Sequence, residues 1–365
     1  MKIALLTDKY CESMQSDQYW SGEGRSWAIL VESLRLLGMD VTFLNYDDML
    51  IEALKACDIA LLSISEAIDR TNNDKSDKSV VNAAPRLIDV QWWSTPQSRS
   101  EASEYANVRC VLASWIPSQV RGVPDSVKST QMTTYMWMPW VSPELALSWE
   151  PEEQPKTVYR WRVGRLDRNT TRDMERRELL RAMEVWSLFK KHRPDWVMQV
   201  PVLDQYLGVD HRKELDDLLC DSEDVELLPS EPHCKWEERL SSKIGLLFAP
   251  CYHAFSHGMW GPSFAGVPSI LGGDTLWWLA EDRPVERTHG GGAYWWEYQT
   301  PHYLYTAWEE TKTEQLVDMM LDLTDPDCST AQKAVAGLQG QVQYRYNQGA
   351  SLDSLWKILR GTITF

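Results

Sequence analysis

The sequence lacks several features that would assign it to a common class of protein. It has no run of 18 apolar residues, so we predict no membrane-spanning helix. It has 37 basic residues against 53 acidic ones, and a net charge of −16 argues against a protein that coats nucleic acid through bulk positive charge. Its seven cysteines are scattered and form no Cys-x-x-Cys pair, which favours free thiols in a reducing cytoplasm.

The N-terminal segment also lacks the marks of a secretory signal. A single Lys precedes a short apolar run over residues 2–6, and no small-residue cleavage site follows it. We therefore expect this run to be the first β-strand of a cytoplasmic protein. The His residues show no metal-ligand spacing with Cys or carboxylates, so we predict no metal site and no requirement for a divalent ion.

Tryptophan, in contrast, is abundant. There are 19 Trp and only six Phe in 365 residues, within an ordinary 43% of hydrophobic and 25% of charged residues. This composition excludes intrinsic disorder as the main state. A Trp ring offers a flat face with one donor, which suits stacking on sugars or bases, although core packing would use the same residues.

The first part of the chain alternates apolar runs with helical patterns. Residues 25–37 repeat apolar side chains at helical spacing, and short apolar runs predict strands over residues 2–6, 41–44, 59–64, 87–90 and 110–112. The polar stretch 69–79 predicts a surface loop. Such a β-α-β rhythm favours a parallel sheet with helices on both faces.

A Pro-rich acidic stretch over residues 138–155 interrupts this rhythm, which then restarts. The later pattern predicts a helix over residues 172–192 and strands over residues 158–163, 197–202, 225–228, 244–248 and 269–271. We therefore predict an α/β protein with two Rossmann-like domains and a ligand site in the interdomain cleft. The expected boundaries are 1–145, 156–330 and a C-terminal helical segment 331–365, in which a helix over residues 352–359 returns to the first domain.

The order of these pieces resembles the glycosyltransferase superfamily of GT-B fold. Residues 158–166 read as an apolar strand followed by Gly164-Arg165, residues 244–250 as a strand that ends in Pro, and Gly266-Val267-Pro268 as the entry to the next strand. The stretch from Arg160 to Arg165 looks nearest to bacteriophage enzymes that glucosylate 5-hydroxymethylcytosine in DNA. The resemblance implies a nucleotide-sugar donor, most simply a UDP-sugar, and a sugar acceptor.

Cations suit the negative diphosphate of such a donor, and several lie after the strand at residues 158–163. Arg165 is the expected diphosphate contact, with Arg168 or Arg172 beside it. The glycines Gly22 and Gly24, in a predicted loop before the first helix, would let the backbone approach the donor phosphates or the acceptor. The structural alternatives are a solvated helix face for the arginines and a plain turn for the two glycines.

The resemblance also implies donor contacts in residues 249–268. The expected contacts are His253, His257, Gly258 and Gly261. Family members usually carry a Glu for the donor ribose where this chain has Gly261, and a Lys where it has Thr170. His253 and His257 would replace the missing hydroxyl partner, or else they are structural.

On the acceptor side, the candidate residues lie at the end of the fourth predicted strand, over residues 89–94, and beside the predicted glycine loop at Glu23. Asp89 and Glu23 are the candidate catalytic acids, and Trp92 or Trp93 is the candidate stacking surface for the acceptor. Adjacent strand residues point to opposite faces, so we expect only one of these two Trp side chains to reach the ligand.

These residues predict a glycosyltransferase that transfers a sugar to an acceptor hydroxyl. The first acceptor hypothesis is a hydroxymethylated pyrimidine in phage DNA, met through a local basic rim in the host cytoplasm. The second is a surface glycan or a small metabolite. The third is an inactive nucleotide-sugar binder, because the family's Glu is missing.

Overall fold

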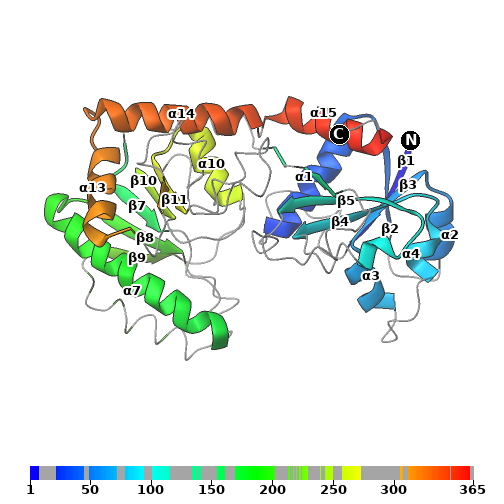
Figure 1. Cartoon of the computed structure of the whole chain (residues 1–365), viewed down its shortest axis with the longest axis horizontal. Helices are drawn as coiled ribbons and strands as arrows, with labels where there is room; N and C mark the ends of the chain where they lie inside the picture. The colour runs from blue at the N-terminus through cyan, green and yellow to red at the C-terminus, as the bar shows by residue number, and fades with distance from the viewer. Residues whose placement is uncertain are drawn as a thin grey trace, which may run out of the picture. The chain divides into compact units, whose positions relative to one another are not determined.

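The chain folds into two compact units, seen in a computed structural model (Figure 1). The first unit comprises Met1–Trp140 and Arg345–Phe365, and the second comprises Val141–Tyr344. The structure describes residues 1–7, 22–44, 49–71, 79–93, 101–115, 134–137, 139–140, 154–160, 169–201, 213, 217, 219, 222, 224–228, 239, 243–249, 257–272, 305–306, 311–345 and 347–361.

The first unit alternates strands with helices along its N-terminal part. Its elements are β1 (Lys2–Leu6), α1 (Gly22–Leu36), β2 (Asp40–Leu44), α2 (Leu50–Lys55), β3 (Ile59–Leu62), α3 (Ile64–Thr71), α4 (Ser79–Ala83), β4 (Leu87–Trp93), β5 (Val108–Trp115), β6 (Thr134–Met136) and α15 (Gln348–Arg360). The strands pair in the order β2-β1-β3-β4-β5-β6, and every pair is parallel.

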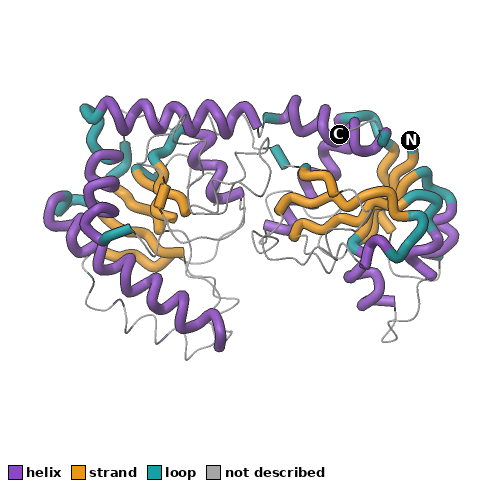
Figure 2. The backbone as a smooth tube through the Cα atoms, in the orientation of Figure 1, coloured by secondary structure: helices purple, strands orange, loops and turns teal. Residues whose placement is uncertain are grey.

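Both faces of this sheet are buried, as a parallel sheet requires. One core joins α1 and α15 to one face of the strands, and it includes Leu30, Leu34, Leu61 and Leu112. The other core joins α2, α3 and α4 to the opposite face. Figure 2 shows these helices around the strands of the unit.

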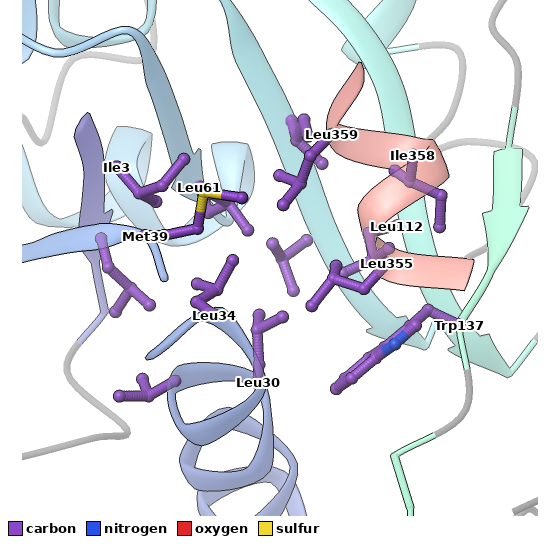
Figure 3. Close-up of a cluster of buried hydrophobic side chains, with 14 of the residues drawn as sticks. Ile3, Leu30, Leu34, Met39, Leu61, Leu112, Trp137, Leu355, Ile358 and Leu359 are labelled. Atoms are coloured by element: carbon purple, nitrogen blue, oxygen red, sulfur yellow. The ribbon is translucent and has the colours of Figure 1, made fainter. Parts of the chain in front are cut away.

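The helix α15 reaches this core from the far end of the chain. Leu355, Ile358 and Leu359 pack with side chains from α1 and the sheet (Figure 3). The indole Nε1 of Trp137 donates to the carbonyl oxygen of Ser351 at 3.1 Å. The helix has clear ends, because the side chain of Asn347 accepts from the backbone N–H of Ala350 and the helix stops at left-handed Gly361.

The second unit repeats the alternation with its own sheet. Its elements are β7 (Thr157–Arg160), α7 (Asn169–His192), β8 (Val197–Pro201), β9 (Val225–Leu228), β10 (Leu246–Ala249), α10 (His257–Ala265), β11 (Ser269–Gly272), β12 (Tyr305–Thr306), α13 (Thr313–Leu323) and α14 (Ser329–Arg345). The parallel strands follow the order β12-β11-β10-β7-β8-β9.

The long helix α7 is anchored by aromatic packing near its C-terminus. Phe189 lies between Trp186 and Trp196, with ring centroids 5.8 and 5.7 Å away. Lys190, on the same turn, donates to the carbonyl oxygen of Trp196 at 2.7 Å and pairs with Asp224 at the start of β9. These contacts tie α7 to the sheet, while α13 packs along it.

The predicted fold class is confirmed, since both units are α/β with a wholly parallel sheet. Two local expectations were wrong. The strand expected over residues 59–64 ends at Leu62, because Ile64 already begins α3. The loop expected over residues 69–79 is shorter than predicted, because α3 extends to Thr71 and α4 begins at Ser79. The short strands β6 and β12 were missed because two or three residues carry no readable periodicity.

We predict that the first unit depends on α15 for its stability. Leu355→Ala should lower the unfolding free energy of this unit by about 2–5 kcal/mol, because a fully buried side chain leaves a cavity. Lys357→Ala, on the exposed side of the same helix, should change it by about 0.5 kcal/mol or less. Urea unfolding followed by Trp fluorescence measures both, and equal stability of the two variants would contradict this prediction.

Candidate functional site

Ligands of open α/β sheets bind outside the carboxyl ends of the strands, where the strand order reverses. In the second unit the order reverses between β7 and β10, so its candidate edge carries Arg160 and Ala249, the last residues of these strands. In the first unit the order reverses between β1 and β3, which are followed by Thr7 and Ser63.

Arg160 is a candidate residue that our reading of the sequence left without a role. Its side chain is only 3% exposed, and it ends a strand whose two preceding residues are fully buried. A guanidinium stays charged at any physiological pH, so Arg160 places a positive charge at the carboxyl edge of the second sheet. A lone Arg closing an otherwise uncharged strand, Thr-Val-Tyr-Arg, is the signal that could have identified it.

The helix α10 begins close to the same edge, after β10. The first N–H groups of a helix have no partner inside it and favour negative charge. Gly258 and Gly261 lie in the first two turns, and Gly261 is buried. Pro262 lacks an N–H, so the carbonyl of Gly258 loses its partner within the helix.

The other end of α10 is fixed by α14. The side chains of Gln343 and Gln339 donate to the carbonyl oxygen of Phe264 at 3.0 and 3.3 Å. Gly266 follows with φ of 91°, and a Cβ there would lie 2.9 Å from the Gln339 side chain. The positive φ is the reason that the predicted Gly-Val-Pro turn requires glycine, since the Gln339 side chain is flexible and could move away from a Cβ.

Several residues predicted for the donor lie where the structure gives no side-chain placement. Arg165, Arg168 and His253 are outside the described residues. Arg172 lies in the first turn of α7 and His257 begins α10, but the structure describes only their backbone. The backbone nevertheless assigns both residues to helix starts that follow β7 and β10, the two strands at the reversal.

The loop expected at Gly22 and Gly24 in the first unit was wrong. Gly22, Glu23 and Gly24 form the first turn of α1 and do not precede it. Gly24 is buried, and the Glu23 side chain is outside the described part. We predicted a loop because glycine is unfavourable inside a helix. The first turn of a helix nevertheless tolerates glycine where another part of the molecule lies close to its backbone.

Asp89 is far more enclosed than the sequence indicated. The strand β4 continues to Trp93, so Asp89 lies within the strand, and its side chain is 1% exposed. Its Oδ1 accepts from the backbone N–H of Ile64 at 2.9 Å, and its Oδ2 accepts from the amide of Gln91. Burial raises the pKa of Asp89 to about 7, and the two hydrogen bonds offset only part of this effect.

This pKa predicts a stability that depends on pH. An unfolded Asp ionises near its ordinary value of 3.8, so the folded protein holds the extra proton up to pH of about 7. The contribution of Asp89 is therefore complete below pH 3.8 and is lost as the pH rises through 7.

Asp89→Asn removes this titration. The variant should be more stable than the parent at pH 8 by roughly 1–4 kcal/mol, with a smaller difference at pH 5. Urea unfolding at both pH values measures this, and a difference that grows toward pH 5 would be the opposite of our expectation.

Trp92 packs inside the first unit. Its ring meets Trp27 edge-on with centroids 5.3 Å apart and lies 6.1 Å from Trp137. It is partly buried and lies against the core that includes α1 and α15. Trp93 follows in β4, but its side chain is outside the described part of the chain.

Two further findings concern the described residues alone. No helix among them is both long and apolar enough to cross a membrane. They include no group of three or more His, Cys, Asp or Glu that could hold a metal ion.

Comparison with solved structures supports the fold assignment over the whole chain. HepE of Anabaena, crystallised with UDP and glucose, has a TM-score of 0.59 at 12% identity, covering 99% of this chain and 100% of HepE. The sucrose-phosphate synthase of Thermosynechococcus elongatus gives 0.60 at 13%, covering 99% and 98%. A mutant O-GlcNAc transferase of Thermobaculum terrenum gives 0.55 at 12%, covering 99% and 67%.

No protein-family model and no curated protein matches the sequence itself. At such low identity these structures show a shared fold, and that fold is the GT-B arrangement of two parallel-sheet α/β units.

Proposed function

We propose that this protein is a glycosyltransferase that moves a sugar from a nucleotide-sugar donor to an acceptor hydroxyl. The observation that carries the proposal is the match along the full length of both chains to HepE, which was crystallised with UDP and glucose. A match of this extent includes both units, not a single nucleotide-binding module. UDP is therefore the nucleotide that we propose for the donor.

The second unit would hold the donor through positive charge at its reversal edge. Arg160 ends β7, and α7 begins nearby in sequence with Arg172 in its first turn. We propose that Arg165, with Arg168 or Arg172, pairs with the donor diphosphate, since a guanidinium fork matches phosphate oxygens.

The start of α10 would complete the donor site. Gly258 and Gly261 would offer backbone to the diphosphate or sugar, and His253 and His257 would offer hydrogen bonds to hydroxyl groups. In this assignment Gly261 occupies the place of the family's ribose-binding Glu, so the two His side chains replace that contact.

We predict that the arginines dominate donor affinity. Arg165→Ala or Arg172→Ala should weaken UDP binding about ten- to hundredfold, because each removes a charge-assisted hydrogen bond worth roughly 1.5–3 kcal/mol. Lys191→Ala, an exposed cation in the last turn of the same helix α7, should leave the affinity unchanged. Titration calorimetry with UDP measures all three, and equal affinities would rule out the assignment.

The first unit would hold the acceptor. We propose that Glu23 acts in catalysis at the start of α1 and that Gly22 and Gly24 allow close approach of a ligand to its backbone. The role of Asp89 follows from its contacts and is developed below.

The tryptophan pair provides a test of the acceptor side. Trp92→Ala should mainly destabilise the first unit, by roughly 3 kcal/mol, because the ring packs in an aromatic cluster. Trp93→Ala should lower sugar transfer about ten- to hundredfold while sparing UDP affinity, because stacking on an aromatic ring is worth roughly 1–3 kcal/mol. Normal transfer by a folded Trp93→Ala variant would place the acceptor elsewhere.

The acceptor separates the remaining hypotheses. A panel of nucleotide sugars, offered with DNA that contains or lacks hydroxymethylated pyrimidines and with free glycans and small sugars, identifies donor and acceptor together. Transfer to hydroxymethylated DNA alone supports the phage-DNA hypothesis, and transfer to sugars supports the glycan or metabolite hypothesis. UDP binding with neither hydrolysis nor transfer would indicate an inactive binder, the reading that the absent Glu at Gly261 favours.

A further inference from the structure

The turn between β3 and α3 is held from outside by a neighbouring strand. Ile64 is the first residue of α3, so its N–H has no partner within the helix. The Oδ1 of Asp89 accepts from this N–H at 2.9 Å across 25 residues of sequence. Asp89 thus caps α3 from β4, with a negative charge at the positive end of the helix when it is ionised.

The same turn carries two hydroxyl groups at the edge of the sheet. The Oγ atoms of Ser63 and Ser65 lie 3.1 Å apart in an exposed contact, and Ser63 Oγ also accepts a long hydrogen bond from the N–H of Glu66 at 3.4 Å. Ser63 directly follows β3, one of the two strands between which the order of the first sheet reverses. These hydroxyls therefore lie where an open α/β sheet binds its ligand.

The geometry of Asp89 suits holding this turn better than removing a proton from a ligand. A general base must come within hydrogen-bond reach of the proton that it abstracts. Asp89 is 1% exposed, and each of its carboxylate oxygens already accepts a hydrogen bond, one from Ile64 and one from Gln91.

We propose that Asp89 is a positioning residue that fixes the Ser63–Ser65 turn, and that the hydroxyl groups of this turn bind the hydroxyl groups of a sugar-like acceptor. The proposal rests on the glycosyltransferase function proposed above. A serine hydroxyl both donates and accepts, as a sugar hydroxyl does, so the pair can match either direction of hydrogen bond. Glu66 on the same turn adds negative charge, which favours a neutral acceptor over a phosphate-bearing one.

The test compares Asp89→Asn with Asp89→Ala. The Asn carbonyl oxygen can still accept from the Ile64 N–H, and the Gln91 amide can reverse to meet the Asn NH₂ group. Asn cannot act as a base. We expect Asp89→Asn to retain the parent's kcat and acceptor KM within about threefold, and Asp89→Ala to raise the acceptor KM about tenfold with unchanged UDP affinity, because the turn loses the hydrogen bond between the Ile64 N–H and residue 89.

Loss of transfer in Asp89→Asn as severe as in Asp89→Ala would instead make Asp89 a base and overturn the proposal. Ser65→Ala is the second variant, since it removes one exposed hydroxyl without touching the core, and it should raise the acceptor KM alone. An unchanged KM in Ser65→Ala would refute the contact between the turn and the acceptor.

Amide hydrogen exchange provides a readout that does not depend on activity. The Ile64 N–H should be protected in the parent and in Asp89→Asn and should exchange faster in Asp89→Ala. Equal protection in all three would show that Asp89 does not hold the turn. If the parent transfers no sugar although these exchange rates differ as expected, the proposed function fails while the positioning role of Asp89 stands.

Discussion

The structure of the first unit depends on burying both faces of a parallel sheet. Crossover connections place helices on the two faces of the sheet. In the core that includes Leu30 and Leu34, α1 is the one helix described in the segment between β1 and β6, and α15 packs beside it from the C-terminal part of the sequence. The bond from Trp137 to Ser351 joins segments 214 residues apart in sequence. The core of the first unit therefore combines residues from α15 with residues from the N-terminal part of the sequence.

Once the faces are covered, the carboxyl edges of the strands are where backbone and polar side chains can meet a ligand. Helix starts gather there because each crossover begins after a strand ends. In the first unit the N–H at the start of α3 donates a hydrogen bond to Asp89, and in the second unit α10 follows β10 while two glutamines of α14 hold its far end. The start of α3 and the end of α10 are thus each held by a contact from another element of the same unit.

Each of the two units buries a different ionisable side chain in its sheet. The second sheet ends β7 in a buried arginine, which suits an anion. The first sheet buries an aspartate, and desolvation keeps its pKa near 7. Burying either charge is unfavourable unless it is paired or hydrogen-bonded, so the fold tolerates each only with specific partners.

The sequence by itself determined the alternation of strands and helices, because short continuous apolar runs mark the buried strands and a period of 3.6 residues marks the helices. It also placed Gly266 at the entry to a strand, but the positive φ that requires glycine there is seen only in the structure. It did not determine that Gly22 and Gly24 lie within α1, because the residue at which a helix starts depends on which other parts of the molecule its backbone contacts. Only the tertiary structure decided that Asp89 is enclosed and bonded to Ile64, since these residues meet through the pairing of β3 with β4, and that Trp92 belongs to a cluster with Trp27 and Trp137. A local sequence pattern shows which face of a helix or strand is apolar. Which other element packs against that face depends on the order of the strands in the sheet, and no short segment of sequence specifies that order.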